Sequence, residues 1–158
     1  MMKKGVDYIG VTCVFFCHDG RGNFLLHKRS NTCRDEQGNW DCGGGALELG
    51  EDFETAVRRE IKEEYCADVA DLKFLTTTNV LRRNGEEKTH WVALIFAAEV
   101  RPGQVKIGEP DAMEEIGWFT EQNLPSPLHS QFHRHFACVR DAGLTKPNPE
   151  GGMAPYAD

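Results

Sequence analysis

The feature that most constrains this chain is a glycine triplet followed by a strongly periodic segment. Gly43-Gly44-Gly45 precedes Phe53–Tyr65, and that second stretch contains neither Gly nor Pro. Its bulky apolar residues recur at every fourth position, at Phe53, Val57, Ile61 and Tyr65. A repeat close to about 3.6 residues predicts one amphipathic helix over 53–65. The glycines before it predict a loop whose backbone can approach a ligand closely.

Apolar and β-branched segments on both sides of this helix predict a sheet. The expected strands are Tyr8–Cys17, Phe24–Lys28, Val69–Asn79, Thr89–Val100 and Glu115–Thr120. The Asn84-Gly85 pair predicts a hairpin turn, and polar residues 30–40 form a surface loop anchored by Trp40. A closing helix is expected over Leu128–Ala142. This order indicates a mixed α/β (α+β) fold, with a single domain over 1–142 and a flexible tail over 143–158.

The charge balance limits the class of ligand. With 18 Lys+Arg and 25 Asp+Glu the formal net charge is −7, so a nucleic-acid polymer would be repelled. A small anion can still bind where a divalent cation reverses the local charge. No apolar run approaches the roughly 20 residues of a membrane span. The six cysteines form no CxxC pair, and no cleavage site follows the first apolar stretch, so we expect reduced thiols and a cytoplasmic location.

Three carboxylates share one stripe of the predicted helix. Glu60 and Glu64 lie one above the other and Glu63 lies on the adjacent row, at the border of the apolar face. Like charges at this spacing destabilise a helix, so a positive group should compensate them. Hard oxygen ligands suit Mg²⁺ or Mn²⁺, which bridge carboxylates to phosphate oxygens. Together with the glycine segment, the stripe indicates a metal-phosphate site.

The spacing Gly45-x5-Glu51-x7-Arg59-Glu60-Ile61-x-Glu63-Glu64 resembles the Nudix box of the Nudix hydrolases, which include MutT. Two neighbouring positions depart from the family pattern, because Gly43 stands in place of a proline and Cys66 in place of a glycine. The order of elements over 8–142 is similar as well. The resemblance implies a Nudix-type α/β/α sandwich with a mixed β-sheet and a catalytic loop-helix-loop.

The same resemblance implies roles for individual residues. Glu60, Glu63 and Glu64, with the Gly44 carbonyl, would hold Mg²⁺, for which Mn²⁺ can substitute; alternatively Glu60 is the general base acting through water. Glu51 and Arg59 would brace the glycine segment against the helix. Glu114 and Glu115 are two candidates for a late carboxylate that serves as a base or an extra ligand. The sequence does not decide between them.

The implied reaction is Mg²⁺-dependent hydrolysis of a phosphoanhydride bond in a nucleoside diphosphate linked to another moiety. A nucleoside triphosphate and a nucleotide sugar are both open as substrates. Two rival functions are a catalytically silent nucleotide sensor or scaffold, and a module that only buffers metal ions. The expected partner is a small-molecule nucleotide, with no nucleic-acid polymer and no membrane, and a homodimer is left open. Trp91 is either a core residue or a stacking surface for a base.

Overall fold

A computed structural model describes residues 1–146 of the chain. The strands are β1 (Gly10–His18), β2 (Phe24–Arg29), β3 (Trp40–Asp41), β4 (Gly43–Ala46), β5 (Val69–Asn84), β6 (Glu87–Val100) and β7 (Met113–Phe119). The α-helices are α1 (Phe53–Tyr65) and α2 (Phe132–Asp141), and two short 3₁₀ turns span Pro102–Gln104 and Glu121–Asn123. No helix in this part of the chain is both long and apolar enough to cross a membrane.

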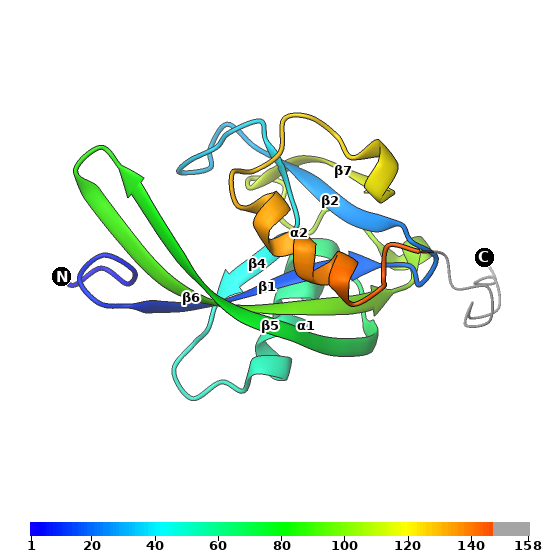
Figure 1. The fold of residues 1–158 in the computed structure, drawn as a ribbon, viewed down its shortest axis with the longest axis horizontal. Helices are drawn as coiled ribbons and strands as arrows, with labels where there is room; N and C mark the ends of the chain where they lie inside the picture. Colours follow the sequence, from blue (N-terminus) through cyan, green and yellow to red (C-terminus); the bar gives the residue numbers. More distant parts are fainter. Residues whose placement is uncertain (147–158) are drawn as a thin grey trace.

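The strands form one mixed sheet. Its main path runs β3-β2-β1-β6-β5, while β4 pairs with β1 and β7 pairs with β2. The β1–β6 pair is parallel, and the other pairs are antiparallel. The long β5–β6 hairpin extends away from the body of the domain (Figure 1). The mixed α+β class predicted from the sequence is confirmed.

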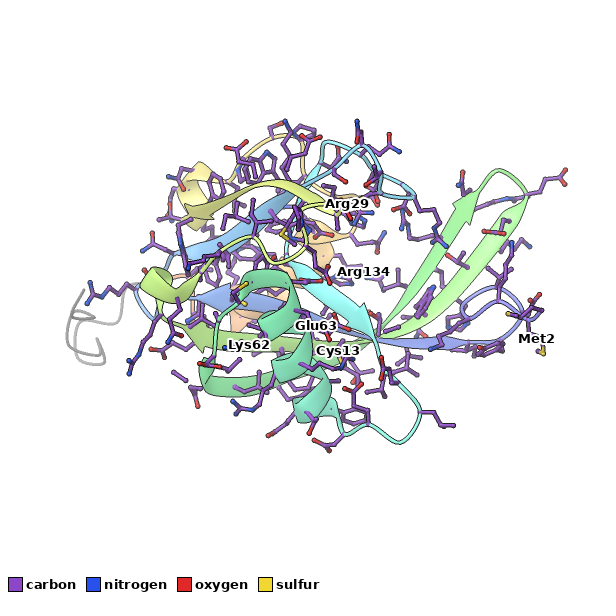
Figure 2. The ribbon with its side chains drawn as sticks, turned by 180° about the vertical axis from the view of Figure 1, so that it is seen from behind. Met2, Cys13, Arg29, Lys62, Glu63 and Arg134 are labelled. Carbon is purple, nitrogen blue, oxygen red and sulfur yellow. The ribbon has the colours of Figure 1, made fainter. Side chains whose placement is uncertain are left out.

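The two helices cover opposite faces of the sheet. In Figure 1 α2 lies in front of the strands and α1 behind them, and the view from behind in Figure 2 reverses the order. Each helix closes its own apolar layer: Val57, Ile61 and Tyr65 belong to one cluster, and Phe132 and Phe136 belong to the other. This arrangement is the predicted α/β/α sandwich, and burial on both faces is its main source of stability.

Helix α1 begins and ends as the sequence predicts. The Asp52 side chain caps its start by accepting hydrogen bonds from the backbone N–H groups of Glu54 and Thr55. The apolar stripe is fully buried from Val57 to Tyr65, whereas Phe53 in the first turn is 47% exposed. The buried stripe therefore starts one turn later than the periodicity indicates.

The glycine triplet is a strand and not the loop that the sequence suggested. Gly43, Gly44 and Gly45 pair with Phe15, Val14 and Cys13 of β1. A Cβ atom at position 43 would lie 2.0 Å from the Phe15 ring, so a buried aromatic side chain occupies the space that a side chain at 43 would need. The same contact explains why this chain has glycine where the family pattern has proline.

The closing helix is shorter than predicted, beginning at Phe132 and ending at Asp141. Residues 127–129 cannot join it because their backbone pairs with β3: the Trp40 N–H donates to the Pro127 carbonyl and the His129 N–H donates to the Trp40 carbonyl. Most of the predicted tail, residues 147–158, lies outside the described residues. At its start, Leu144 packs on the second apolar cluster and Thr145 is buried, so the packed domain extends past residue 142.

The end of α1 yields a prediction about stability. Cys66 caps the helix in the left-handed conformation, with φ of 58°, and its N–H donates to the Lys62 carbonyl. A Cβ atom in this conformation costs roughly 1–2 kcal/mol, and glycine avoids that cost. We expect Cys66→Gly to raise the free energy of unfolding in urea by about 1 kcal/mol. Cys66→Ala keeps the Cβ atom and should show no comparable gain; an equal gain in both variants would contradict the explanation.

Candidate functional site

A cavity lies where the sheet divides. β1 and β2 pair at His18 and Phe24, and beyond that pair β1 continues against β4 while β2 continues against β3. The chain crosses from β3 to β4 at Cys42, so the two halves of the sheet diverge on either side of that residue. The cavity between them has a volume of about 340 Å³. Its lining includes Gly44, Glu64, Trp91, Glu109, Gln131 and His135.

At the acidic end of this cavity Glu64 lines the wall, and Glu60 lies outside the lining, against Gly45. Glu64 is only 8% exposed, and its Oε2 atom has no hydrogen-bond partner. The Glu60 carboxyl group lies directly over Gly45, where an added Cβ atom would be 2.1 Å from the Glu60 carboxyl carbon. Position 45 therefore requires glycine so that Glu60 can reach the backbone of β4. Glu63 is half exposed on the outer row of α1 (Figure 2).

Burial and mutual repulsion raise the pKa values of these carboxyl groups. Burial raises the pKa of Glu64 well above its usual range, and the nearby charges of Glu60, Glu109 and Asp41 raise it further, while a hydrogen bond from the Gly44 backbone opposes the shift. Burial also raises the pKa of Glu60, against the lowering effect of Arg59. Negative charge is thus concentrated at one point of the cavity wall.

Arg59 lies beside this charge and hydrogen bonds three acidic side chains, with a fourth, Glu48, at 3.9 Å. Its Nε and Nη2 atoms donate to the two carboxylate oxygens of Glu51 at 2.6 and 3.0 Å. Its Nη1 atom donates to Glu60 at 2.9 Å and to Glu63 at 3.2 Å. The bidentate bond to Arg59 holds the pKa of Glu51 below its usual range. This geometry is the one that a brace between α1 and the segment after β4 requires.

The late carboxylate that faces the acidic end is Glu109, which the sequence reasoning missed. Glu109 lines the cavity, and its charge raises the pKa of both Glu60 and Glu64. The two candidates chosen from the sequence lie elsewhere: Glu114 and Glu115 are exposed on β7, do not line the cavity, and Glu114 pairs with Lys28 at 3.7 Å. Glu109 stands between Gly108 and Pro110 in the loop before β7, and its place at the cavity depends on how that loop docks on α1.

Backbone contacts explain why that loop delivers Glu109. The Gly108 N–H donates to the Glu64 carbonyl at 2.8 Å, and the Lys106 N–H donates to the Tyr65 carbonyl at 3.0 Å. These bonds satisfy carbonyl groups that the end of α1 leaves without helical partners. A Cβ atom on Gly108 would lie 2.0 Å from the Glu63 carbonyl oxygen, so only glycine allows so close an approach.

Basic side chains that were not among the predicted site residues also line the cavity. Arg29 bonds Asp35 at 2.8 Å, and Arg82 bonds Asp35 at 2.9 Å and Glu36 at 2.6 Å. Lys28, the neighbour of Arg29 on β2, forms an ion pair with Glu114 instead. The arrangement places two guanidinium groups on the wall of a cavity that has an acidic end, which suits an anion held on one side by a cation.

The acidic end fits a divalent metal ion by its chemistry. It offers hard carboxylate oxygens, a buried Glu64 Oε2 atom with no partner, and glycine backbone with no side chain in the way. Within residues 1–146, however, no three His, Cys, Asp or Glu side chains come together in a group that could hold a metal ion. Glu60 and Glu63 hydrogen bond Arg59, so their oxygens are directed toward the guanidinium.

The brace geometry generates the second prediction. The side chains of Glu51 and Arg59 are 11% and 27% exposed, so removing the guanidinium leaves shielded carboxylates without a cation. We expect Arg59→Ala to lower the midpoint of thermal unfolding by at least about 4 °C. The control is Arg58→Ala, which removes the neighbouring guanidinium, bonded to the Val69 carbonyl, and should have a much smaller effect.

A double-mutant cycle with Glu51→Ala separates a true brace from two independent contacts. Loss of either partner should remove most of the benefit of the other, so the double variant should be little worse than Arg59→Ala. Effects on the free energy of unfolding that simply add would show that the pair is not a brace.

Comparison with known proteins places this geometry in a family. The model of the NUDIX domain matches residues 8–139. The crystal structure of a MutT NUDIX hydrolase from Burkholderia pseudomallei is similar to this chain with a TM-score of 0.74 and 30% sequence identity, over 84% of this chain and 98% of that one. The MutT protein of Methanosarcina mazei Go1 has the same fold, with a TM-score of 0.68 and 24% identity, over 85% of this chain and 95% of that one.

Among curated proteins, the mouse 8-oxo-dGDP phosphatase NUDT18 is 25% identical over 82% of this chain, a match that spans 37% of the mouse protein. The NAD-capped RNA hydrolase NudC of Stutzerimonas stutzeri is 31% identical over 67% of this chain and 35% of its own length. The chain therefore spans little more than a third of these two relatives. The family model nevertheless covers most of the chain, from the start of β1 into α2. The chain belongs to the NUDIX domain family.

Proposed function

We propose that this protein hydrolyses a phosphoanhydride bond in a nucleoside diphosphate linked to another moiety, with Mg²⁺ as the ion that it requires and Mn²⁺ as a substitute. The observation that carries the proposal is the buried Glu64 Oε2 atom, which has no partner and lies in a wall crowded with other carboxylates. Uncompensated buried charge is costly, and a cation bound with its substrate removes that cost.

The residues divide into three roles. Glu60 and Glu64 would hold the ion, with Glu63 and the Gly44 carbonyl as further ligands. When bound, the ion would neutralise phosphate oxygens and activate water for attack on phosphorus. Arg59 keeps Glu60 and Glu63 positioned by hydrogen bonds and leaves the Glu64 oxygen available. Glu109 faces the same point from a separate loop and is the best-placed group to accept a proton from water; Glu60, acting through water, is the alternative.

The substrate class follows from the shape and charge of the cavity. An acidic end with two guanidinium groups on the same wall suits a phosphate chain, and a volume of about 340 Å³ is in the range of small-molecule sites. The two curated relatives act on 8-oxo-dGDP and on NAD-capped RNA, according to their names. We infer a small nucleotide as the substrate, with a nucleoside triphosphate and a nucleotide sugar as the first two candidates. Self-association and a cytoplasmic location stay predictions.

The direct test is a panel of nucleoside triphosphates, nucleoside diphosphates and nucleotide sugars, with products resolved by chromatography. We expect at least one to release phosphate, pyrophosphate or a nucleoside monophosphate. EDTA should abolish that turnover, and added Mg²⁺ or Mn²⁺ should restore it, because the carboxylates cannot bind the substrate anions without a cation. Turnover that persists in chelator would contradict the metal assignment. Binding without turnover across the panel would favour the nucleotide sensor instead.

Glu64 provides a sharper test because activity and stability should change in opposite directions. Glu64→Gln should lower kcat by about 100-fold, since a ligand for the ion is lost. It should also raise the midpoint of thermal unfolding in EDTA, because a neutral amide removes a buried charge from the neighbourhood of Glu60 and Glu109. Glu54→Gln removes the same charge from an exposed position in the first turn of α1 and should leave kcat unchanged. Near-native kcat in Glu64→Gln would show that this residue is not a ligand.

A further inference from the structure

Three buried side-chain atoms in the described residues have no hydrogen-bond partner, and they share one cavity. They are Glu64 Oε2, Gln131 Oε1 and His135 Nε2, and all three residues line the cavity between the two halves of the sheet. A buried polar atom without a partner costs free energy, so each one calls for a group that pairs with it. The proposed metal ion accounts for Glu64 but not for the other two.

Gln131 and His135 reach the cavity from a different helix than Glu64 does. Gln131 is the residue before α2 and His135 is one turn into it, a spacing that places both on the same side of the helix. Helix α2 packs on the face of the sheet opposite to α1, which carries Glu60 and Glu64 (Figures 1 and 2). Of the acidic lining residues, Glu64 comes from α1, Asp41 from β3 and Glu109 from the loop before β7. The two uncharged polar groups come from α2 and the residue before it.

Two other histidines of the cavity wall, His27 and His129, already have hydrogen-bond or ion-pair partners, so they do not call for a ligand. His129 accepts a hydrogen bond from the Gln131 backbone N–H at Nδ1, at 3.2 Å, and its Nε2 atom contacts Glu36 at 2.7 Å. His27 hydrogen bonds the Tyr65 hydroxyl group at 2.6 Å. The bond from Gln131 to His129 also fixes the backbone that carries the Gln131 side chain. Gln131 Oε1 and His135 Nε2 thus lack partners while the two histidines near them have theirs.

The chemistry of the pair excludes a phosphate group as its ligand. Gln131 Oε1 is a hydrogen-bond acceptor and repels phosphate oxygens. His135 is 7% exposed, and burial lowers its pKa to about 4, so its ring is uncharged at neutral pH. The walls beside these residues include the side chains of Val14, Val80 and Trp91. A flat, uncharged ring with an N–H donor beside an acceptor matches both the apolar walls and the two polar atoms.

We propose that Gln131 and His135 recognise the edge of a nucleobase: Gln131 Oε1 accepts a hydrogen bond from an N–H group of the base, and His135 Nε2 donates to the adjacent acceptor atom. The inference rests on the proposed function, because it takes the ligand to be a nucleotide whose phosphates lie toward Glu64. It assigns base selection to α2 and the reacting phosphates to α1 and β4.

The test measures binding, so that it can be separated from hydrolysis. Isothermal titration calorimetry on the full chain with Mg²⁺ compares AMP, GMP, CMP and UMP with purine riboside 5′-monophosphate, which has no N–H donor on its base edge, and with ribose 5-phosphate. We expect at least one natural nucleotide to bind about 10-fold or more tightly than the purine riboside compound, as the loss of one well-formed base contact requires. Equal affinity for the purine riboside compound and every natural nucleotide would overturn the proposal.

Matched variants assign the effect to the two side chains. Gln131→Met keeps the length and approximate volume of the side chain, and His135→Phe keeps a flat ring without the Nε2 atom. Each should reduce the preference for the natural base to within about threefold of the purine riboside compound. Gln122→Met and His133→Phe change exposed residues of the same types outside the cavity and should leave the preference intact. Preference retained in both cavity variants would overturn the proposal. If the monophosphates bind with base selectivity while no compound of the hydrolysis panel is turned over, the proposed hydrolysis fails and the base-recognition assignment stands.

Discussion

Repulsion among buried carboxylates is the constraint on which the rest of this site depends. Glu60 and Glu64 are held on one stripe of α1, and Glu109 approaches the same point from another loop. The charge of Glu109 raises the pKa of both, and the charge of Glu60 raises the pKa of Glu64. A fold retains such charge only where positive charge compensates it. Arg59 compensates part of it by bonding Glu51, Glu60 and Glu63, but its guanidinium has no bond to Glu64. In the proposed function, the uncompensated remainder would attract a cation and, through it, an anionic substrate.

Glycine makes this crowding possible at two points of close approach. Gly45 lets the Glu60 carboxyl group lie against β4, and Gly108 lets the loop before β7 lie against the last carbonyl groups of α1. A side chain at either position would push a carboxylate away from the cavity. Uncharged backbone contacts at Gly45 and Gly108 therefore assemble the site. They hold the carboxylates close together although these groups repel one another.

The sequence predicted the parts of this structure that depend on local spacing. The bounds of α1, the carboxylate stripe and the Glu51–Arg59 contact all follow from positions within one turn-and-helix segment, where geometry is fixed by the helical repeat. Prediction from the sequence failed where contacts with distant segments determine the local structure. The glycine triplet became β4 because β1 pairs with it, and α2 begins late because Trp40 binds the preceding backbone. Glu109 was missed because its position depends on docking of the loop to α1, which no local pattern reports.

The division of the sheet explains how one cavity can serve two kinds of recognition. Because β1 and β2 diverge after His18 and Phe24, side chains from both faces of the sheet reach the same space, which a continuous sheet would keep apart. Glu64 reaches this space from α1, whereas Gln131 and His135 reach it from the other helix as uncharged polar groups. A change on α2 can alter which ligand fits without disturbing the carboxylates, because the two helices stand in separate apolar clusters. Under the proposed roles, selectivity would belong to α2 and reaction to α1 and β4, so substrate choice could vary while the reaction stays the same.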